Sequence, residues 1–197
     1  LREEETPVRI QCRRTTRETD VALALTHPGG GTCRLDLPCG FLAHMLELLA
    51  FHGRFDLEVQ ARGDVQVDAH HLTEDLGIVL GEALGELARS EPRERYGWCL
   101  LPMDGSLARV ALDLSGRGGL SWEGTFPVPS CGDFDLELVP EFLTALAREG
   151  RITLHAALLA ADNGHHAAEA VFKGLGRALR QALTPSEGPV SSKDVTP

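Results

Sequence analysis

Hydrophobic and polar residues alternate in two short segments near the start of the chain, at 8–12 and 21–25. An alternation with period two predicts half-buried β-strands. The segment that follows, 27–31, has the sequence His-Pro-Gly-Gly-Gly, which is typical of a turn. It predicts a hairpin connection with His27 exposed to solvent.

From residue 40 onward, hydrophobic residues recur at steps of three and four, which predicts a helix that ends near Gly53. A strand at 55–61 and a long helix carrying Leu72 to Leu87 follow. After a charged segment at 90–95, the same order of elements repeats. The elements predicted there are strands at 97–101, 107–114 and 119–126, a helix at 138–148, a strand at 152–158 and a helix that ends near 183.

This order predicts an α/β fold of the α+β sandwich type that is built by internal duplication. Each half-domain would be a four-stranded mixed sheet with two helices on one face, and the helices would pack between the sheets. The fourth strand of each half follows a helix, so a right-handed crossover can place it parallel to a neighbour. We assign 1–92 to the first half-domain, 93–183 to the second, and 184–197 to a tail rich in Pro, Ser and Gly.

The clearest sign of the duplication is a repeated histidine pair. His70 and His71 are followed by Glu74, and the same spacing recurs at His165, His166 and Glu169. The two copies continue to match downstream at a constant offset, with glycine, alanine and leucine at equivalent positions. A single pattern of this kind more commonly consists of ordinary surface or core residues. Two copies at the starts of predicted helices instead indicate metal ligands.

Helical geometry shows how these residues can bind metal. Residues three or four apart share a face, so each glutamate lies beside its histidine pair. Adjacent histidines point about 100° apart, so a pair serves two metals more easily than one. We predict that His44, His71 and Glu74 form one half-set of ligands and that His155, His166 and Glu169 form its counterpart. His70 and His165 would then cross over, each completing the metal site of the other half. Imidazole with carboxylate suits Mn, Fe, Co or Zn, and spacing does not choose among them.

Composition narrows the classes of partner. Lys and Arg total 19 against 29 Asp and Glu, a formal charge of −10. This acidity argues against general nucleic-acid binding, so an anionic ligand would need a local basic pocket. No apolar run approaches the roughly 20 residues that a membrane span requires.

Five cysteines, none in a C-x-x-C motif, indicate reduced thiols and a cytoplasmic protein. Cys39 lies near His44 in the sequence, but buried packing is favoured over a Cys/His nucleophile.

Several motifs, in this order and spacing, resemble the imidazoleglycerol-phosphate dehydratase family along nearly the whole chain. The matching segments are 17–19, 40–46 with 52–53, 63–64 with 68–75, 95–97, 102–104, 113–117, 153–155 and 163–173.

The resemblance implies two similar α/β halves, two Mn²⁺ ions per active site, and a homo-oligomer of 24 subunits with active sites between subunits. The implied reaction removes water from D-erythro-1-(imidazol-4-yl)glycerol 3-phosphate to give 3-(imidazol-4-yl)-2-oxopropyl phosphate, a step of L-histidine biosynthesis. No carbonyl acidifies the departing hydrogen, so simple base abstraction is slow. Binding both ring nitrogens to metal favours an imidazolate, which can expel the hydroxyl as a diazafulvene.

The resemblance also implies roles for individual residues. Glu18 and Asp104 would act on the substrate as acid/base and hydroxyl contacts, and Glu74 and Glu169 would assist proton transfer. His52 and the metal-bound histidines, His44, His70, His71 and His165, would also contact the substrate. A basic pocket for the phosphate would contain Arg95, Arg117, Lys173, Ser191 and Lys193.

The chain departs from the family pattern at Ala43, Gly105, Gly118 and Asp194, none of which is a predicted ligand. Two other functions stay open. A dinuclear metal hydrolase would use the same ligands, and a non-catalytic, metal-stabilised assembly protein would leave the acidic and basic residues without a role.

Overall fold

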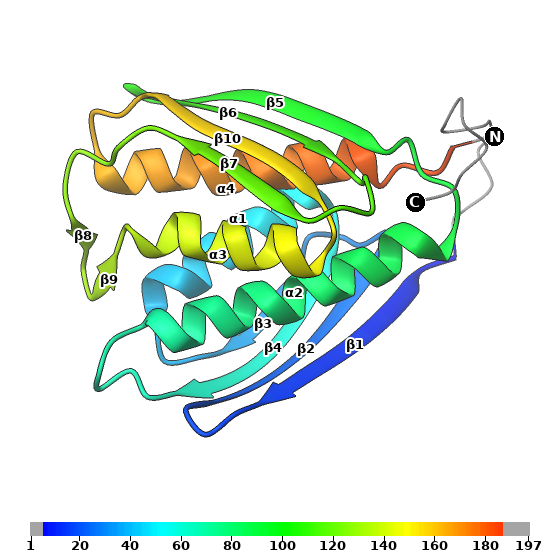
Figure 1. The fold of residues 1–197 in the computed structure, drawn as a ribbon, viewed down its shortest axis with the longest axis horizontal. Coiled ribbons are helices and arrows are strands. Elements are labelled where there is room, and N and C mark those ends of the chain that lie inside the picture. The colour runs from blue at the N-terminus through cyan, green and yellow to red at the C-terminus, as the bar shows by residue number, and fades with distance from the viewer. Residues whose placement is uncertain (1–5, 187–197) are drawn as a thin grey trace.

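The computed structural model describes residues 6–186 and has two four-stranded sheets that enclose a layer of four helices (Figure 1). The elements of the first half are β1 (Val8–Thr15), β2 (Thr19–His27), β3 (Cys33–Asp36), α1 (Gly40–Gly53), β4 (Asp56–Gly63) and α2 (His70–Ser90). Those of the second half are β5 (Tyr96–Met103), β6 (Ser106–Asp113), β7 (Gly119–Glu123), β8 (Ser130–Cys131), β9 (Phe134–Asp135), α3 (Leu138–Glu149), β10 (Thr153–Ala160) and α4 (Gly164–Ala182).

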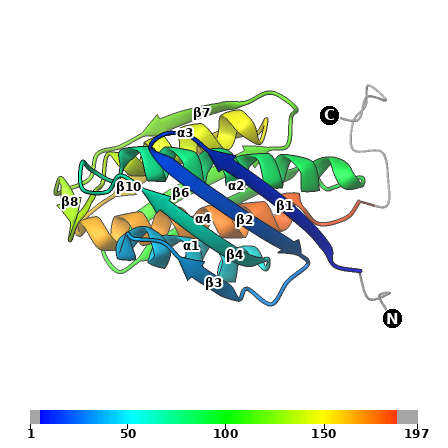
Figure 2. The same ribbon diagram turned by 90° about the horizontal axis from the view of Figure 1, so that it is seen from below.

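The two sheets have the same topology. The first has the strand order β1-β2-β4-β3 and the second has the order β5-β6-β10-β7. In each sheet the first three strands are antiparallel, and the fourth pairs in parallel with the strand that follows the helix. Figure 2, which views the molecule from below, shows the first sheet lying across the helices. The predicted fold class, two duplicated mixed sheets with the helices between them, is confirmed.

The predicted hairpin after β2 is wrong, because β4 lies between β2 and β3 in the sheet. The glycine-rich turn instead passes close to the start of β4. Gly29 donates its amide to the carbonyl of Arg54, and a Cβ on Gly29 would lie 2.5 Å from the amide nitrogen of Asp56. His27 ends β2 and is only 5% exposed, so its expected solvent exposure is also wrong.

The helices pack in parallel pairs, α2 against α3 and α1 against α4, and glycines allow the close approach. A Cβ on Gly77 of α2 would lie 2.7 Å from the carbonyl oxygen of Phe142, and one on Gly176 of α4 would lie 2.6 Å from that of Leu49. Because each pair is parallel and the pairs are aligned, all four helices begin at the same end of the molecule (Figure 1). Each pair combines one helix from each half.

Smaller differences concern the connections. The β8–β9 hairpin was not predicted, and its buried Phe134 stacks on Phe41 with ring centroids 5.2 Å apart. In the segment between α2 and β5, Arg93 is buried and donates to the carbonyl of Leu183. The division of the chain at residue 92 stays a prediction. Only 184–186 of the predicted tail lie within the described residues.

Among the described residues, no helix is long and apolar enough to cross a membrane. All five cysteines are free.

Candidate metal centre and active site

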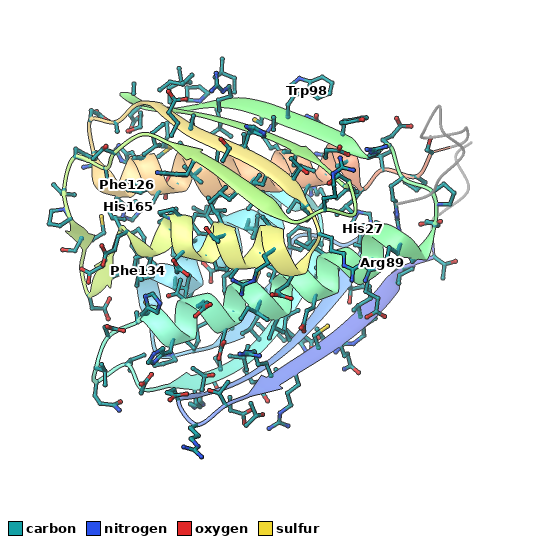
Figure 3. All side chains as sticks on the ribbon, viewed as in Figure 1. His27, Arg89, Trp98, Phe126, Phe134 and His165 are labelled. Carbon is teal, nitrogen blue, oxygen red and sulfur yellow. The ribbon has the colours of Figure 1, made fainter. Side chains whose placement is uncertain are left out.

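The predicted ligands gather where the four helices begin. This end of the molecule carries His165 and Phe134, opposite the end that carries His27 and Arg89 (Figure 3). Helix N-termini carry partial positive charge, which favours carboxylates there. Two groups of three donor residues lie in this region.

The first group consists of His44 from α1 and His165 and Glu169 from α4. The Nε2 atoms of His44 and His165 lie 2.9 Å and 3.3 Å from Oε1 of Glu169. One ligand atom from each of the three residues lies within 4.8 Å of the others. Phe41 packs edge-on against the His165 ring, with centroids 5.3 Å apart. Two imidazoles and a carboxylate that converge in this way fit a divalent transition metal.

Glu169 is held in the charged form that a ligand requires. Burial opposes its ionisation, but hydrogen bonds from Lys173 and His44 outweigh burial and lower the pKa of Glu169 to about 2. The Nζ of Lys173 lies 2.8 Å from Oε2. Metal ligands must be deprotonated, so this carboxylate is ready to bind at neutral pH.

The second group consists of His70 and Glu74 from α2 and Glu141 from the first turn of α3, again with ligand atoms within 4.8 Å of one another. Arg148 of α3 approaches Glu74, with 3.7 Å between Nη2 and Oε1. One imidazole and two carboxylates form a harder donor set, which also suits Mn²⁺.

These groupings correct the predicted half-sets. The structure places His44 with His165 and Glu169, whereas we expected it to join His71 and Glu74. The physical reason is that the helices pair between the halves, so each group draws on both copies of the repeat. His155 joins neither group among the described residues. It is exposed on β10, and its neighbours in the sequence, Leu154 and Ala156, are the ones that face the helices.

Glu141 is the candidate ligand that the sequence analysis missed. It occupies the position in α3 that His44 occupies in α1. Both residues lie near the starts of equivalent helices, and Gly53 and Gly150 follow them at the same spacing where those helices end. Applying the duplication to the helices would have found it. His155 shares the side-chain type of His44 but lies in the next element, β10.

The second histidine of each pair faces a different neighbour. The Nδ1 of His71 lies 3.0 Å from Oδ2 of Asp64, and this hydrogen bond raises the pKa of His71. The Nδ1 of His166 lies 3.5 Å from Oδ2 of Asp104. The two rings of each pair are nearly perpendicular, at 90° for the first pair and 86° for the second. Among the described residues, the second histidine of each pair lies outside the donor group that contains the first, as expected for adjacent helical residues.

Glu18 lies in the turn between β1 and β2, where it lines a groove together with Thr16 and Asp64. Its negative charge contributes to the raised pKa of His71, so the two side chains are close enough to interact. The structure therefore brings Glu18 to the edge of the region that holds the second metal group.

The predicted phosphate residues are spread along the molecule. Lys173 is bound to Glu169 near the first group. Arg95 lies at the far end of α4, where its amide donates to the carbonyl of Ala182 and its guanidinium binds Asp113 at 2.6 and 3.1 Å. Arg117 is exposed in the neighbouring loop. Ser191 and Lys193 lie outside the described residues.

Three other positions can now be placed. His52 ends α1 close to Lys173, and burial together with nearby cations lowers its pKa. Cys39 is buried, which raises the pKa of its thiol and fits packing better than a nucleophilic role. At the departure Gly105, a Cβ would lie 2.2 Å from Oδ2 of Asp162, so that carboxylate fills the space a larger residue would need.

The model of the imidazoleglycerol-phosphate dehydratase family matches residues 38–179, a span that holds both donor groups. The chain belongs to this family. Two relatives that carry the dehydratase name come from Desulforudis audaxviator and Clostridium novyi. The first is 50% identical over 95% of this chain and 97% of its own length, and the second is 48% identical over 92% and 95%.

Solved dehydratase structures have the same fold. The imidazoleglycerol-phosphate dehydratase of Staphylococcus aureus superposes with a TM-score of 0.83 at 38% identity, covering 91% of this chain and all of its own. The Pyrococcus furiosus dehydratase, solved in complex with (S)-C348, gives a TM-score of 0.82 at the same identity, covering 93% of this chain and 99% of its own.

Proposed function

We propose that this member of the dehydratase family removes water from D-erythro-1-(imidazol-4-yl)glycerol 3-phosphate to give 3-(imidazol-4-yl)-2-oxopropyl phosphate, with two Mn²⁺ ions per active site. The observation that carries the proposal is the pair of three-donor groups, His44 with His165 and Glu169, and His70 with Glu74 and Glu141. A substrate ring with two nitrogens matches a centre with two metals. His71 and His166 are further ligands in this proposal.

When bound, the metals would act as Lewis acids on the two ring nitrogens and favour the imidazolate form of the ring. The protein supplies the proton transfers. Glu18, from its groove beside His71, accepts the proton of the carbon next to the one that bears the departing hydroxyl, and Asp104 holds that hydroxyl. Glu74 and the ionised Glu169 are assigned as ligands that can assist these transfers, and His52 as a substrate contact.

The phosphate residues support an active site shared between subunits. His165 and Ala182 are 17 residues apart on α4, which separates the first metal group from Arg95 by about 25 Å within one chain. This distance exceeds the length of a substrate that consists of an imidazole, three carbons and a phosphate. We therefore assign Arg95 and Arg117 to the site of a neighbouring subunit, together with Lys193 and Ser191 of the tail.

Each metal group also has fewer donors than a transition metal takes, since tetrahedral sites use four ligands and octahedral sites six. Ligands from a second subunit would complete them. We propose a homo-oligomer of 24 subunits, as the family resemblance implies. The free cysteines and the biosynthetic role support a cytoplasmic location.

The test is a product assay on the purified protein loaded with Mn²⁺. We expect a 2-oxo product from the phosphorylated substrate, no free phosphate, and loss of activity on chelation that Mn²⁺ restores. Release of phosphate would instead support the dinuclear hydrolase. An assembled protein that retains its metal but forms no product would support the non-catalytic alternative.

A further inference from the structure

Each histidine pair presents its first imidazole to a metal group and its second to an aspartate. Asp64 lies just beyond β4, with its side chain 19% exposed, and both of its oxygens face Nδ1 of His71, at 3.0 and 3.2 Å. In the second half, Asp104 of the β5–β6 turn lies 3.5 Å from Nδ1 of His166. Asp64 thus makes a hydrogen bond with Nδ1 of His71, whereas Asp104 approaches the same atom of His166 without a hydrogen bond between them.

The position of Asp64 is fixed by its own loop. Its carbonyl accepts a hydrogen bond from the amide of Val67 at 2.8 Å, and Asp68 accepts the amide of His70 at 2.8 Å as α2 begins. The loop therefore fixes the backbone of Asp64 beside the first helical turn.

A neutral imidazole carries one proton, and a carboxylate beside Nδ1 holds that proton there, which leaves the lone pair on Nε2. The same atom is used in the first metal group, where His44 and His165 both direct Nε2 to Glu169. We propose that Asp64 is a positioning residue for the metal centre: it fixes the tautomer and ring orientation of His71, so that Nε2 binds the metal. This inference rests on the proposed role of His71 as a ligand.

The ordinary alternative is a surface ion pair that contributes only to stability. The His71 side chain is 46% exposed, and exposed ion pairs of this kind contribute little to stability. A residue that orients a ligand has a different signature, because its loss weakens metal binding by about 10–100-fold. Metal affinity therefore separates the two roles.

The experiment uses the full-length protein, stripped of metal and titrated with Mn²⁺, with the free ion followed by electron paramagnetic resonance. Asp64→Asn should weaken Mn²⁺ binding at least about tenfold while leaving the urea midpoint of the metal-free protein nearly unchanged. The control is Glu58→Gln, since Glu58 binds Arg9 in a partly exposed ion pair away from the histidines. Its Mn²⁺ affinity should equal that of the parent.

A double substitution tests whether Asp64 acts through His71. His71→Ala and His71→Ala with Asp64→Asn should bind Mn²⁺ equally, because the carboxylate has no ring left to orient. An unchanged affinity in Asp64→Asn would overturn the inference. So would an equal loss in both backgrounds, since the carboxylate would then act by its charge or bind the metal itself. A parent protein that binds Mn²⁺ but forms no 2-oxo product would overturn the proposed function alone, because these affinity ratios do not depend on turnover.

Discussion

His27 provides a quantitative test of the fold, because it is buried at the end of β2 without a hydrogen-bond partner for Nδ1 among the described residues. Burial, reinforced by the positive charge of Arg93, lowers the pKa of His27 from 6.5 to about 4. The unfolded chain therefore binds a proton in this pH window that the folded chain does not. Stability must fall as the pH drops from the unfolded pKa towards the folded one.

The magnitude follows from the two pKa values. At pH 5, protonation of His27 in the unfolded state but not in the folded state costs about 2 kcal/mol of unfolding free energy, and the full shift corresponds to about 3 kcal/mol. His27→Leu removes the titrating group and the unpaired nitrogen while keeping an apolar side chain in the core. Between pH 7.5 and pH 5, the unfolding free energy of the variant should therefore fall by about 2 kcal/mol less than that of the parent.

The assay is urea unfolding of both proteins at the two pH values, at one protein concentration and with chelator present, since metal binding also depends on pH. Contributions of the other histidines are common to both proteins and cancel in the comparison. With a slope of about 2 kcal/mol per molar urea, the difference amounts to about 1 M in the midpoint. Equal losses in the parent and the variant would refute the burial argument for His27.

Three further outcomes are expected. Glu141→Gln should lower the Mn²⁺ content of the purified protein, whereas Glu149→Gln at the end of the same helix should not; equal metal content in both would remove Glu141 from the centre. Gly77→Ala should cost about 1–3 kcal/mol of unfolding free energy because its Cβ meets the backbone of α3, while Gly119→Ala, with no atom within 4 Å, serves as the control in the same urea titration. Lys193→Ala should raise KM for the phosphorylated substrate with metal still bound, and an unchanged KM would count against a phosphate role for the tail.

Local patterns accounted for the elements and their order. The helix predicted from residue 40 to near Gly53 and the strand predicted at 55–61 correspond to α1 at Gly40–Gly53 and β4 at Asp56–Gly63. Hydrophobic periodicity depends only on which face of an element is buried, so neighbouring residues are enough to predict it. The β8–β9 hairpin was not predicted because each of its strands is two residues long, which is too short to show a hydrophobic period.

Pairing between distant elements could not be predicted in this way. The turn after β2 looked like a hairpin, yet β4 enters between β2 and β3, and His27 is buried as a result. A local turn motif carries no information about which later strand will lie beside it.

The sequence by itself determined the duplication, the helix-start position of the two histidine pairs, and the types of donor available to a metal. Only the tertiary structure decided which donors meet. Because α1 packs on α4 and α2 packs on α3, His44 joins Glu169 from the other half, and Glu141 joins His70, while the His155 side chain is exposed on β10. Metal coordination requires side chains from different elements to lie within a few ångströms of one another, and the packing of the helices decides which side chains do so.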